Sequence, residues 1–196
     1  MTQPMTDAML RRFREGMDRA LAAEVPEPTA MTLATVDEQC RPAARTVLLK
    51  DADASGFVFY TNLDSRKGRH LAANPAVSLA MWWRETAEQV LVDGVVEPVS
   101  DSEADAYFAS RDRGSQIGAW ASRQSQPLAG RETLVERIEE IEARYRDQPV
   151  PRPDHWSGFR VRPRRVEFWY GREYRLHERV CFEIEEDQWT ERLLYP

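Results

Sequence analysis

The sequence predicts an α+β protein that is mainly antiparallel, with a small closed β-barrel and helices at its periphery. Many short segments are rich in β-branched and aromatic residues and are separated by polar turns, which is typical of antiparallel strands. The connections between the early strands are too short for parallel crossovers, so a βαβ nucleotide-binding fold is disfavoured. Segments with helical spacing interrupt the strands at a few joints, which suits a barrel in an α+β setting.

The first predicted element is an amphipathic helix over residues 6–23, which Pro26 and Pro28 bring to an end. Its apolar side chains recur at helical spacing: Leu10, Phe13, Met17 and Leu21. A chain of 196 residues is long enough to bury a core as one domain. We therefore expect one domain over 1–196, with the helix and a linker at 1–27 and the barrel with inserted helices at 28–196.

The predicted strands follow in chain order, and each is bounded by polar or proline-containing turns. They lie at residues 31–36, 45–50, 57–61, 77–83, 89–99, 159–170, 173–184 and 189–195.

Four further helices are expected between these strands. Ser65 caps a helix over 66–74 that Pro75 ends, because a serine side chain can accept from the free N–H groups at a helix start. Asp101 or Ser102 caps a second helix that runs through Phe108, and the remaining two lie at 115–122 and 131–147.

Composition and spacing exclude several classes of function. The formal charge of −6 argues against general nucleic-acid binding, which needs a basic face. No run approaches the roughly 18 apolar residues needed to cross a bilayer, and the N-terminus lacks a secretory signal. Cys40 and Cys181 form no C-x-x-C pattern, so a reduced, cytoplasmic setting is the simpler interpretation. The three histidines show no metal-ligand spacing, and no nucleophile or phosphate-loop motif is present.

Residues 45–67 form a candidate anion site. Two predicted strands and one helix start bring Arg45, Lys50, Arg66 and Lys67 beside hydroxyl groups. Free backbone N–H groups at a helix start, together with arginine and lysine, bind phosphate well. A solvated basic turn is the equally weighted alternative from these residues alone.

A second group of polar side chains follows at residues 107–115. Tyr107 and Arg111 are four residues apart at a predicted helix end, with Ser115 just beyond, and this set suits a second phosphate. Near the C-terminus Arg175, His177 and the following arginine alternate on one face of the predicted strand. That face can meet either solvent or a polar ring, and periodicity alone slightly favours solvent.

Six motifs occur in an order and at separations that resemble those of the pyridoxamine 5′-phosphate oxidase family. They are RTVLLK, FYTNLDSRKG, YFASRDRGSQIGAW, ASRQS, EFW and RLHER, and the match runs from about residue 28 to the C-terminus. The resemblance implies an FMN-binding split β-barrel that works as a homodimer, with FMN bound at the subunit interface by residues from both chains.

The resemblance also implies the site residues, motif by motif. Arg66 and Lys67 would hold the FMN phosphate, and Arg175 and His177 are the expected catalytic pair, placed against the pyridine ring on the side away from the flavin. Leu176, between them, should point to the core. The implied FMN site comprises Arg45, Thr46, Val47, Leu48, Leu49, Lys50, Tyr60, Thr61, Arg66, Lys67, Gln89, Gln124, Ser125, Trp169 and Arg179. The implied substrate site comprises Lys50, Tyr107, Arg111, Ser115, Arg175, Leu176 and His177.

The implied reaction is oxidation of pyridoxamine or pyridoxine 5′-phosphate to pyridoxal 5′-phosphate, in vitamin B6 biosynthesis or salvage. FMN accepts the hydride and oxygen reoxidises it to give hydrogen peroxide, with ammonia released from the amine. The N-terminal region lacks the Arg-x-x-Tyr-like segment that some members fold over the substrate, and residues 9–17 are the candidate replacement.

Two alternatives differ in substrate or in class. Residues 82–90 resemble the phenazine-biosynthesis flavin oxidases as closely as the vitamin enzymes, although those relatives lose the phosphate-binding residues that are kept here. A non-catalytic FMN or pyridoxal phosphate binder is the second alternative, and the retention of both Arg175 and His177 argues against it.

Overall fold

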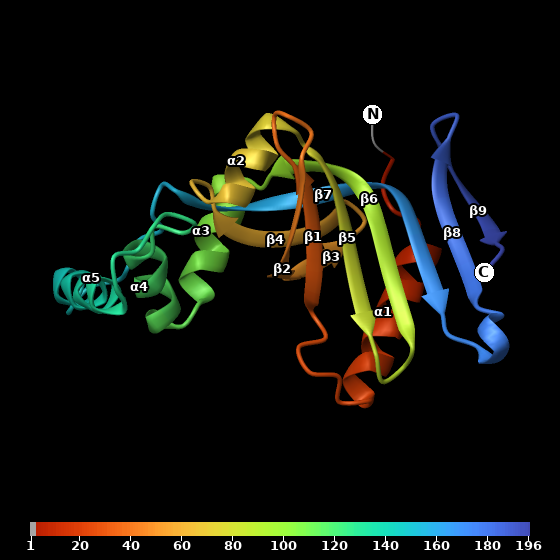
Figure 1. Ribbon diagram of the computed structural model, residues 1–196, viewed down its shortest axis with the longest axis horizontal. Helices are drawn as coiled ribbons and strands as arrows, with labels where there is room; N and C mark the ends of the chain where they lie inside the picture. Colours follow the sequence, from red (N-terminus) through yellow and green to blue (C-terminus); the bar gives the residue numbers. More distant parts are fainter. Residues whose placement is uncertain (1–2) are drawn as a thin grey trace.

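Nine antiparallel strands form one strongly curled sheet in the computed structural model, which describes residues 3–196 (Figure 1). The strands are β1 (Ala30–Val36), β2 (Pro42–Leu48), β3 (Asp51–Asp53), β4 (Gly56–Asn62), β5 (Ala76–Trp83), β6 (Glu88–Pro98), β7 (Trp156–Tyr170), β8 (Glu178–Glu185) and β9 (Gln188–Leu194). The helices are α1 (Asp7–Ala22), α2 (Arg66–Ala73), α3 (Asp101–Ser110), α4 (Arg113–Ala121) and α5 (Arg131–Arg144), with a 3-10 turn at Glu173–Arg175.

The sheet closes at a bend between β2 and β3. These strands end the path β2-β1-β5-β6-β7-β4-β3, yet only Leu49 and Lys50 separate them in the chain. The Leu49 N–H donates to Thr29 O at 2.9 Å and extends the β1–β2 pairing, and the Lys50 N–H donates to Val58 O at 2.8 Å and extends the β3–β4 pairing. One bent segment therefore bridges β1 and β4, which confirms the predicted antiparallel barrel.

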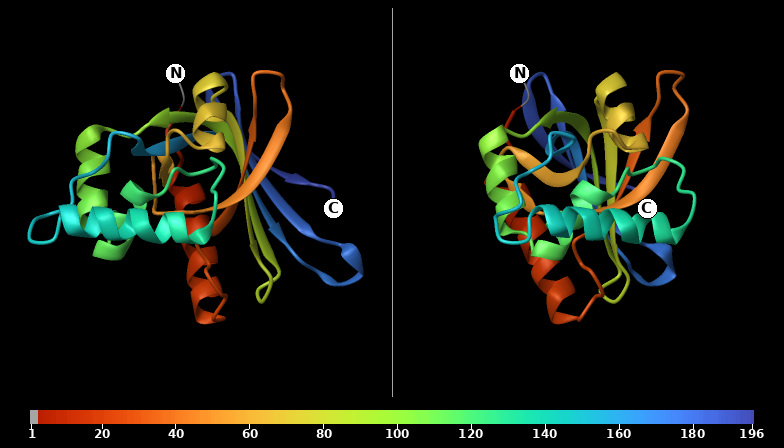
Figure 2. Two further views of the ribbon diagram at one scale, coloured as in Figure 1. Left: turned by 60° about the vertical axis from the view of Figure 1, so that its left-hand side comes forward. Right: turned by 90° about the vertical axis from the view of Figure 1, so that its left-hand side faces the viewer.

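β7 is 15 residues long and serves both the barrel and the C-terminal hairpin. Its first part pairs with β4 and its last part with β8, on the same edge, while β6 runs along the other edge. The β8–β9 hairpin consequently leaves the barrel on the side away from α3–α5, as Figure 1 and the left view of Figure 2 both show.

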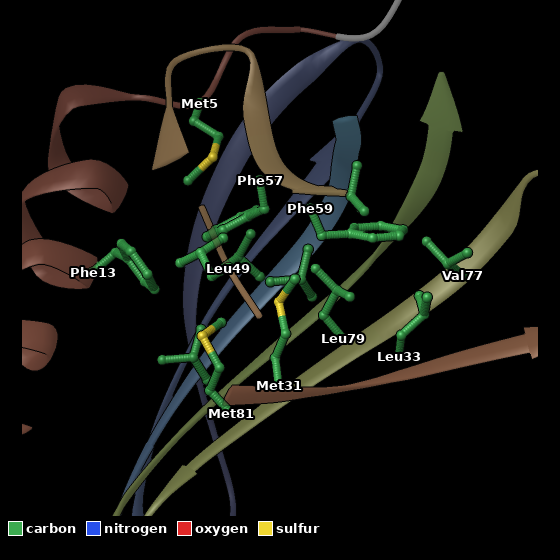
Figure 3. Packing of buried hydrophobic residues seen from close by; sticks show 14 of the residues in the cluster. Met5, Phe13, Met31, Leu33, Leu49, Phe57, Phe59, Val77, Leu79 and Met81 are labelled. Carbon is green, nitrogen blue, oxygen red and sulfur yellow. The ribbon is translucent and has the colours of Figure 1, made fainter. Parts of the chain in front are cut away.

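The barrel interior is filled by apolar side chains from most strands, and α1 packs against it (Figure 3). The Phe13 ring of α1 meets Phe57 edge-on, with ring centroids 5.2 Å apart. Burial of one such side chain stabilises the fold by about 1.5–3 kcal/mol. Arg19 of α1 also donates two hydrogen bonds, of 2.7 and 2.8 Å, to the buried carboxylate of Glu88. The predicted N-terminal helix is therefore confirmed, and these contacts fix it against the barrel.

Helices α3, α4 and α5 form a separate lobe at one end of the barrel (Figure 2). Its core gathers around Phe108, Ile117, Ile141 and Trp156. α5 faces this core with one side, because Leu134, Ile138 and Tyr145 also pack there. The N-cap of α3 was mispredicted: Ser100, rather than Asp101 or Ser102, accepts from the Glu103 N–H at 3.1 Å.

The expected strand over 173–184 is wrong at its start. Glu173–Arg175 is a 3-10 turn, and Tyr174 and Arg175 have φ values of 56° and 63°, which no strand residue adopts. β8 therefore begins only at Glu178. Leu176 is 68% exposed and does not point to the core as expected. Within residues 3–196 no helix combines the length and the hydropathy needed to cross a membrane.

Candidate functional site

A cavity of about 710 Å³ lies between the barrel and the helical lobe. β2 and β4 form one wall, α2 contributes Lys67, and α3 and α4 form the other wall. Eleven of the predicted site residues line it: Thr46, Val47, Leu48, Lys50, Tyr60, Thr61, Lys67, Tyr107, Arg111, Ser115 and Gln124. The two groups of candidate phosphate-binding residues, at 45–67 and 107–115, are some 40 residues apart in the chain. Both contribute side chains to this one cavity.

The first group surrounds the start of α2. Ser65 caps this helix as predicted, since its hydroxyl accepts from the Gly68 N–H at 3.2 Å. Lys67 Nζ donates to Thr61 Oγ1 at 3.0 Å and to Gln124 Oε1 at 2.6 Å. Burial, and secondly the charge of Arg45, lower the pKa of Lys67. An anion placed here would relieve this excess of positive charge.

Arg45 and Arg66 stand beside this group without lining the cavity. Burial and the nearby charge of Arg66 lower the pKa of Arg45. The Arg45 guanidinium donates from Nη1 to Leu33 O at 3.0 Å and to Thr35 Oγ1 at 2.8 Å. Arg66 lies on the exposed side of the first turn of α2. Three cationic side chains thus gather around one capped helix start, a donor set that fits a phosphate.

The second group is built on α3 and α4 around Arg111. Its Nη1 is buried and has no hydrogen-bond partner among the described residues. The guanidinium lies over the rings of Trp156 and Phe108, at 4.9 and 5.7 Å from their centroids. Burial lowers the pKa of Arg111. A buried donor without a partner costs about 1–3 kcal/mol, so this atom is prepared for an anionic ligand.

Stacked aromatic rings support Arg111 from below. Tyr60 and Tyr107 lie parallel with centroids 4.0 Å apart, and Tyr60 also stacks on Trp156 at 5.3 Å. Burial is the first cause that raises the pKa of Tyr60, to about 12. Its phenol can donate a hydrogen bond to a ligand. The stack brings the phenol of Tyr60, from the β4 wall of the cavity, beside the phenol of Tyr107 and the guanidinium of Arg111, from the helical wall.

Ser115 is held by a residue that sequence reasoning missed. Asp112 caps α4 by accepting from the Ser115 N–H, and its other oxygen accepts from the Ser115 hydroxyl, both at 2.8 Å. Hydrogen bonds from the Ser115 backbone and side chain lower the pKa of Asp112. The cavity is also lined by residues that the predicted site did not include: Asn62, Ser110, Gly118, Ala119, Ser122 and Trp156. An Asp three residues before Ser115 was a readable capping signal.

The remaining predicted residues lie elsewhere in this chain. Gln89, Trp169 and Arg179 are cross-strand neighbours on β6, β7 and β8, and Trp82 on β5 continues the row. We call these four residues the outer row, because the residues next to them, Trp83, Val90, Phe168 and Val180, face the core. Trp82 is 51% exposed and meets Trp169 edge-on at 5.8 Å. The outer row does not line the cavity.

Arg175 and His177 follow the outer row in the loop between β7 and β8. The His177 ring lies tilted against the Trp169 ring, with centroids 4.4 Å apart, and its Nδ1 accepts from the Arg172 N–H at 3.2 Å. This hydrogen bond places the proton of the neutral ring on Nε2. Arg175 is exposed and makes no hydrogen bond to the described residues. The expected strand face that alternates these side chains is therefore replaced by a strained turn.

A buried carboxylate orients Arg179. Glu167 accepts from Arg179 Nε and Nη2 at 2.7 and 3.1 Å, and from Arg165 at 2.5 Å. Burial by itself would raise the pKa of Glu167, but the two arginines outweigh it and hold the pKa below its ordinary value. Leu49 also differs from the expectation of a ligand contact, because its side chain packs in the core. Ser125 has a φ of 69° and lies outside the cavity lining.

Comparisons with known proteins agree with this architecture. Residues 17–145 match a family model described as pyridoxamine 5′-phosphate oxidase, and residues 156–196 match one described as the pyridoxine 5′-phosphate oxidase C-terminal dimerisation region. The chain is 57% identical over 187 residues to a pyridoxine/pyridoxamine 5′-phosphate oxidase of Myxococcus xanthus strain DK1622, covering 95% of this chain and 91% of that one. It is 50% identical to the enzyme of that name from Zymomonas mobilis subsp. mobilis, covering 98% and 100%.

Solved structures show the same fold. PhzG from Burkholderia lata 383, crystallised with tetrahydrophenazine-1-carboxylic acid, is similar with a TM-score of 0.91 and 32% identity, covering 95% of this chain and 92% of that one. An FMN-binding protein from Nostoc punctiforme PCC 73102 is similar in fold, with a TM-score of 0.75 and 16% identity, covering 94% and 97%.

Proposed function

The chain belongs to the pyridoxamine 5′-phosphate oxidase family, and from this premise we propose that it oxidises pyridoxamine 5′-phosphate, pyridoxine 5′-phosphate or both to pyridoxal 5′-phosphate. The observation that carries the proposal is the pair of cationic groups around one cavity, at Lys67 and at Arg111. A flavin mononucleotide and a phosphorylated substrate bring one phosphate each, so two anion sites are the expected requirement.

The group at the start of α2 fits the phosphate of FMN. The phosphate would be held by Arg45, Arg66, Lys67 and the free N–H groups of the capped helix. The lowered pKa values of Arg45 and Lys67 and the place of Arg66 in the first turn of α2 support this. The flavin itself would contact Thr46, Val47, Leu48 and Lys50 along with Tyr60, Thr61 and Gln124. When bound, FMN supplies the two-electron acceptor, and oxygen then takes the electrons to give hydrogen peroxide.

The group on α3 and α4 fits the 5′-phosphate of the substrate. Arg111 offers a buried donor without a partner, and Lys50, Tyr107 and Ser115 line the same cavity. Phosphate binding is remote from the carbon that reacts, so its energy can orient the substrate there. The amine substrate loses a hydride and a proton to give an imine, which water hydrolyses to the aldehyde and ammonia. The alcohol substrate gives the aldehyde directly.

The catalytic residues would come from a second subunit. Arg175 and His177, with Trp169 and Arg179 of the outer row, lie within residues 156–196, the region that matches the dimerisation model, and do not line the cavity of their own chain. In a homodimer they would cover the partner's cavity, with Gln89, Trp169 and Arg179 against the flavin. Leu176 is exposed in the single chain and would pack against the substrate there. His177 would present Nε2–H as a donor to the ring hydroxyl of the substrate.

The alternative of a phenazine-type oxidase is supported by the 32% identity to PhzG, which was crystallised with a phenazine compound. The whole set of Lys50, Tyr107, Arg111 and Ser115 around one cavity favours a phosphorylated substrate instead. The exposed Arg175 and the oriented His177 likewise favour catalysis over simple storage of a flavin or pyridoxal phosphate.

Oxygen uptake by the FMN-loaded protein tests the proposal. We expect uptake with pyridoxamine 5′-phosphate or pyridoxine 5′-phosphate and no uptake with the unphosphorylated vitamers at the same concentration. A protein that binds no FMN would overturn the proposal. Turnover of a dihydrophenazine without turnover of either B6 phosphate would replace it with the phenazine-type alternative.

A further inference from the structure

A buried threonine on β1 joins the two elements that carry the cationic group, β2 and α2. Thr35 of β1 is 2% exposed, and its hydroxyl oxygen lies 2.8 Å from Arg45 Nη1 on β2 and 3.1 Å from His70 Nδ1 on α2. His70 is itself 7% exposed and lies one turn after Arg66 on α2. The motifs that predicted the phosphate site include neither Thr35 nor His70.

The direction of these hydrogen bonds follows from the chemistry of the donors. A guanidinium can only donate, so the Thr35 oxygen accepts from Arg45. The hydroxyl then has one proton to donate, and His70 Nδ1 is the acceptor within reach. We assign His70 the neutral form with its proton on Nε2, in which Nδ1 accepts from the Thr35 hydroxyl. The surrounding charges agree: burial, then Arg66 and Arg45, lower the pKa of His70, and Arg69 adds to this while Asp37 opposes it.

The chain of bonds constrains how Arg45 can turn. Both N–H groups of Nη1 are used, one by Leu33 O and one by Thr35. Nε and Nη2 make no hydrogen bond to the residues that the structure describes, and they remain available to a ligand. Because His70 belongs to the same helix as Arg66 and Lys67, the Thr35 hydroxyl also sets the position of Arg45 relative to those two cations.

We propose that Thr35 and His70 are positioning residues that hold Arg45 toward the phosphate of the bound flavin. This inference rests on the proposed function, since it assumes that FMN is the ligand of the α2 site. Neither residue is expected to touch the flavin. Their contribution should appear only for a ligand that carries the phosphate, and riboflavin, which has the same ring system without it, is the matched probe.

Binding of FMN and of riboflavin to the full-length apoprotein, followed by flavin fluorescence, tests the proposal. Thr35→Val and His70→Leu each remove the hydrogen bond between residues 35 and 70. We expect each variant to bind FMN more weakly, on the order of tenfold, and to bind riboflavin as tightly as the wild type does. His70→Gln keeps an acceptor for the Thr35 hydroxyl and should restore most of the affinity for FMN. Thr32→Val, an exposed position on the same strand, is the control and should bind both ligands like the wild type.

Riboflavin also reports on damage to the fold. Equal losses for FMN and riboflavin, or no loss for either, would overturn the positioning role. Nitrogen NMR of the imidazole rings gives an independent reading, because the chain has three histidines and His70→Gln identifies the signal of interest. A ring protonated on Nδ1 at neutral pH contradicts the inference. A wild type that binds FMN no better than riboflavin contradicts the proposed function itself, and the inference with it.

Discussion

Replacement of Arg111 by alanine should weaken the binding of the phosphorylated substrate and leave FMN unaffected. In the structure Arg111 Nη1 is buried without a partner, and the guanidinium rests on Trp156 and Phe108. A hydrogen bond to a charged group contributes about 1.5–3 kcal/mol, which corresponds to about 10- to 150-fold in affinity. Arg111 is only half-buried, so solvent screening favours the lower part of that range.

The assay is steady-state oxygen uptake with pyridoxamine 5′-phosphate, together with fluorescence titration of FMN into the apoprotein. We expect kcat/KM to fall by about 10- to 150-fold while the Kd for FMN stays within about twofold. Arg113→Ala is the matched control, because Arg113 lies two residues away but donates to the carbonyl oxygens of Tyr145 and Gln148. Equal losses of affinity for substrate and FMN in Arg111→Ala would show that the two phosphate-binding sites have been assigned to the wrong ligands. The same conclusion would follow if Arg113→Ala had an effect as large as that of Arg111→Ala.

Three further outcomes follow from the geometry. Arg66→Ala should show the reverse pattern to Arg111→Ala, with FMN weakened by about 1.5 kcal/mol in a fluorescence titration and the KM for substrate little changed once FMN saturates; an unchanged Kd for FMN contradicts this. Glu167→Gln should lower the free energy of unfolding by about 3 kcal/mol at pH 7. The folded-state pKa of Glu167 is depressed, so the stabilisation by its carboxylate is complete above the unfolded pKa of about 4.3 and is lost as pH falls through the folded value. Free energies of unfolding from urea titrations of the two proteins should therefore converge in acid. A difference that stays constant with pH refutes the stabilising role of the ionised Glu167. In an alkaline titration, Tyr60→Phe and the wild type should show the same tyrosinate absorbance up to about pH 11, because the pKa of Tyr60 is raised to about 12. A lower absorbance of the variant below that pH would contradict the buried stack.

Local signals predicted the start of α2 and the side chains that lie near it. Ser65 caps the helix as expected, and the neighbouring strands bring Lys50, Thr61 and Lys67 to one cavity. These residues lie close together in the chain, so strand and helix patterns suffice to place them. Arg111 could be placed on a helix end by the same reasoning. Its unpaired nitrogen could not be foreseen, because that depends on the position of Trp156 some 45 residues later.

The C-terminal segment shows where periodicity fails. Alternation in the RLHER motif imitates a strand, but the positive φ values at Tyr174 and Arg175 interrupt it before β8 begins. Motif order also could not reveal that the outer row does not line the cavity of its own chain. Thr35 and His70 were missed because their contact joins a strand and a helix that are 35 residues apart.

In the proposed homodimer, each catalytic centre combines the cavity of one subunit with Arg175 and His177 of the other. Subunit mixing tests this arrangement directly. An Arg111→Ala protein and an Arg175→Ala/His177→Ala protein are each assayed alone and then after unfolding and refolding together in equal amounts, with pyridoxamine 5′-phosphate well below KM.

A mixed dimer would carry both defects in one centre and none in the other. Random pairing makes half of the dimers mixed, so about a quarter of all centres become intact and about a quarter of the wild-type kcat/KM should return. Activity of the mixture that stays at the mean of the two variants would contradict the shared centre and place both groups of residues in the service of separate sites.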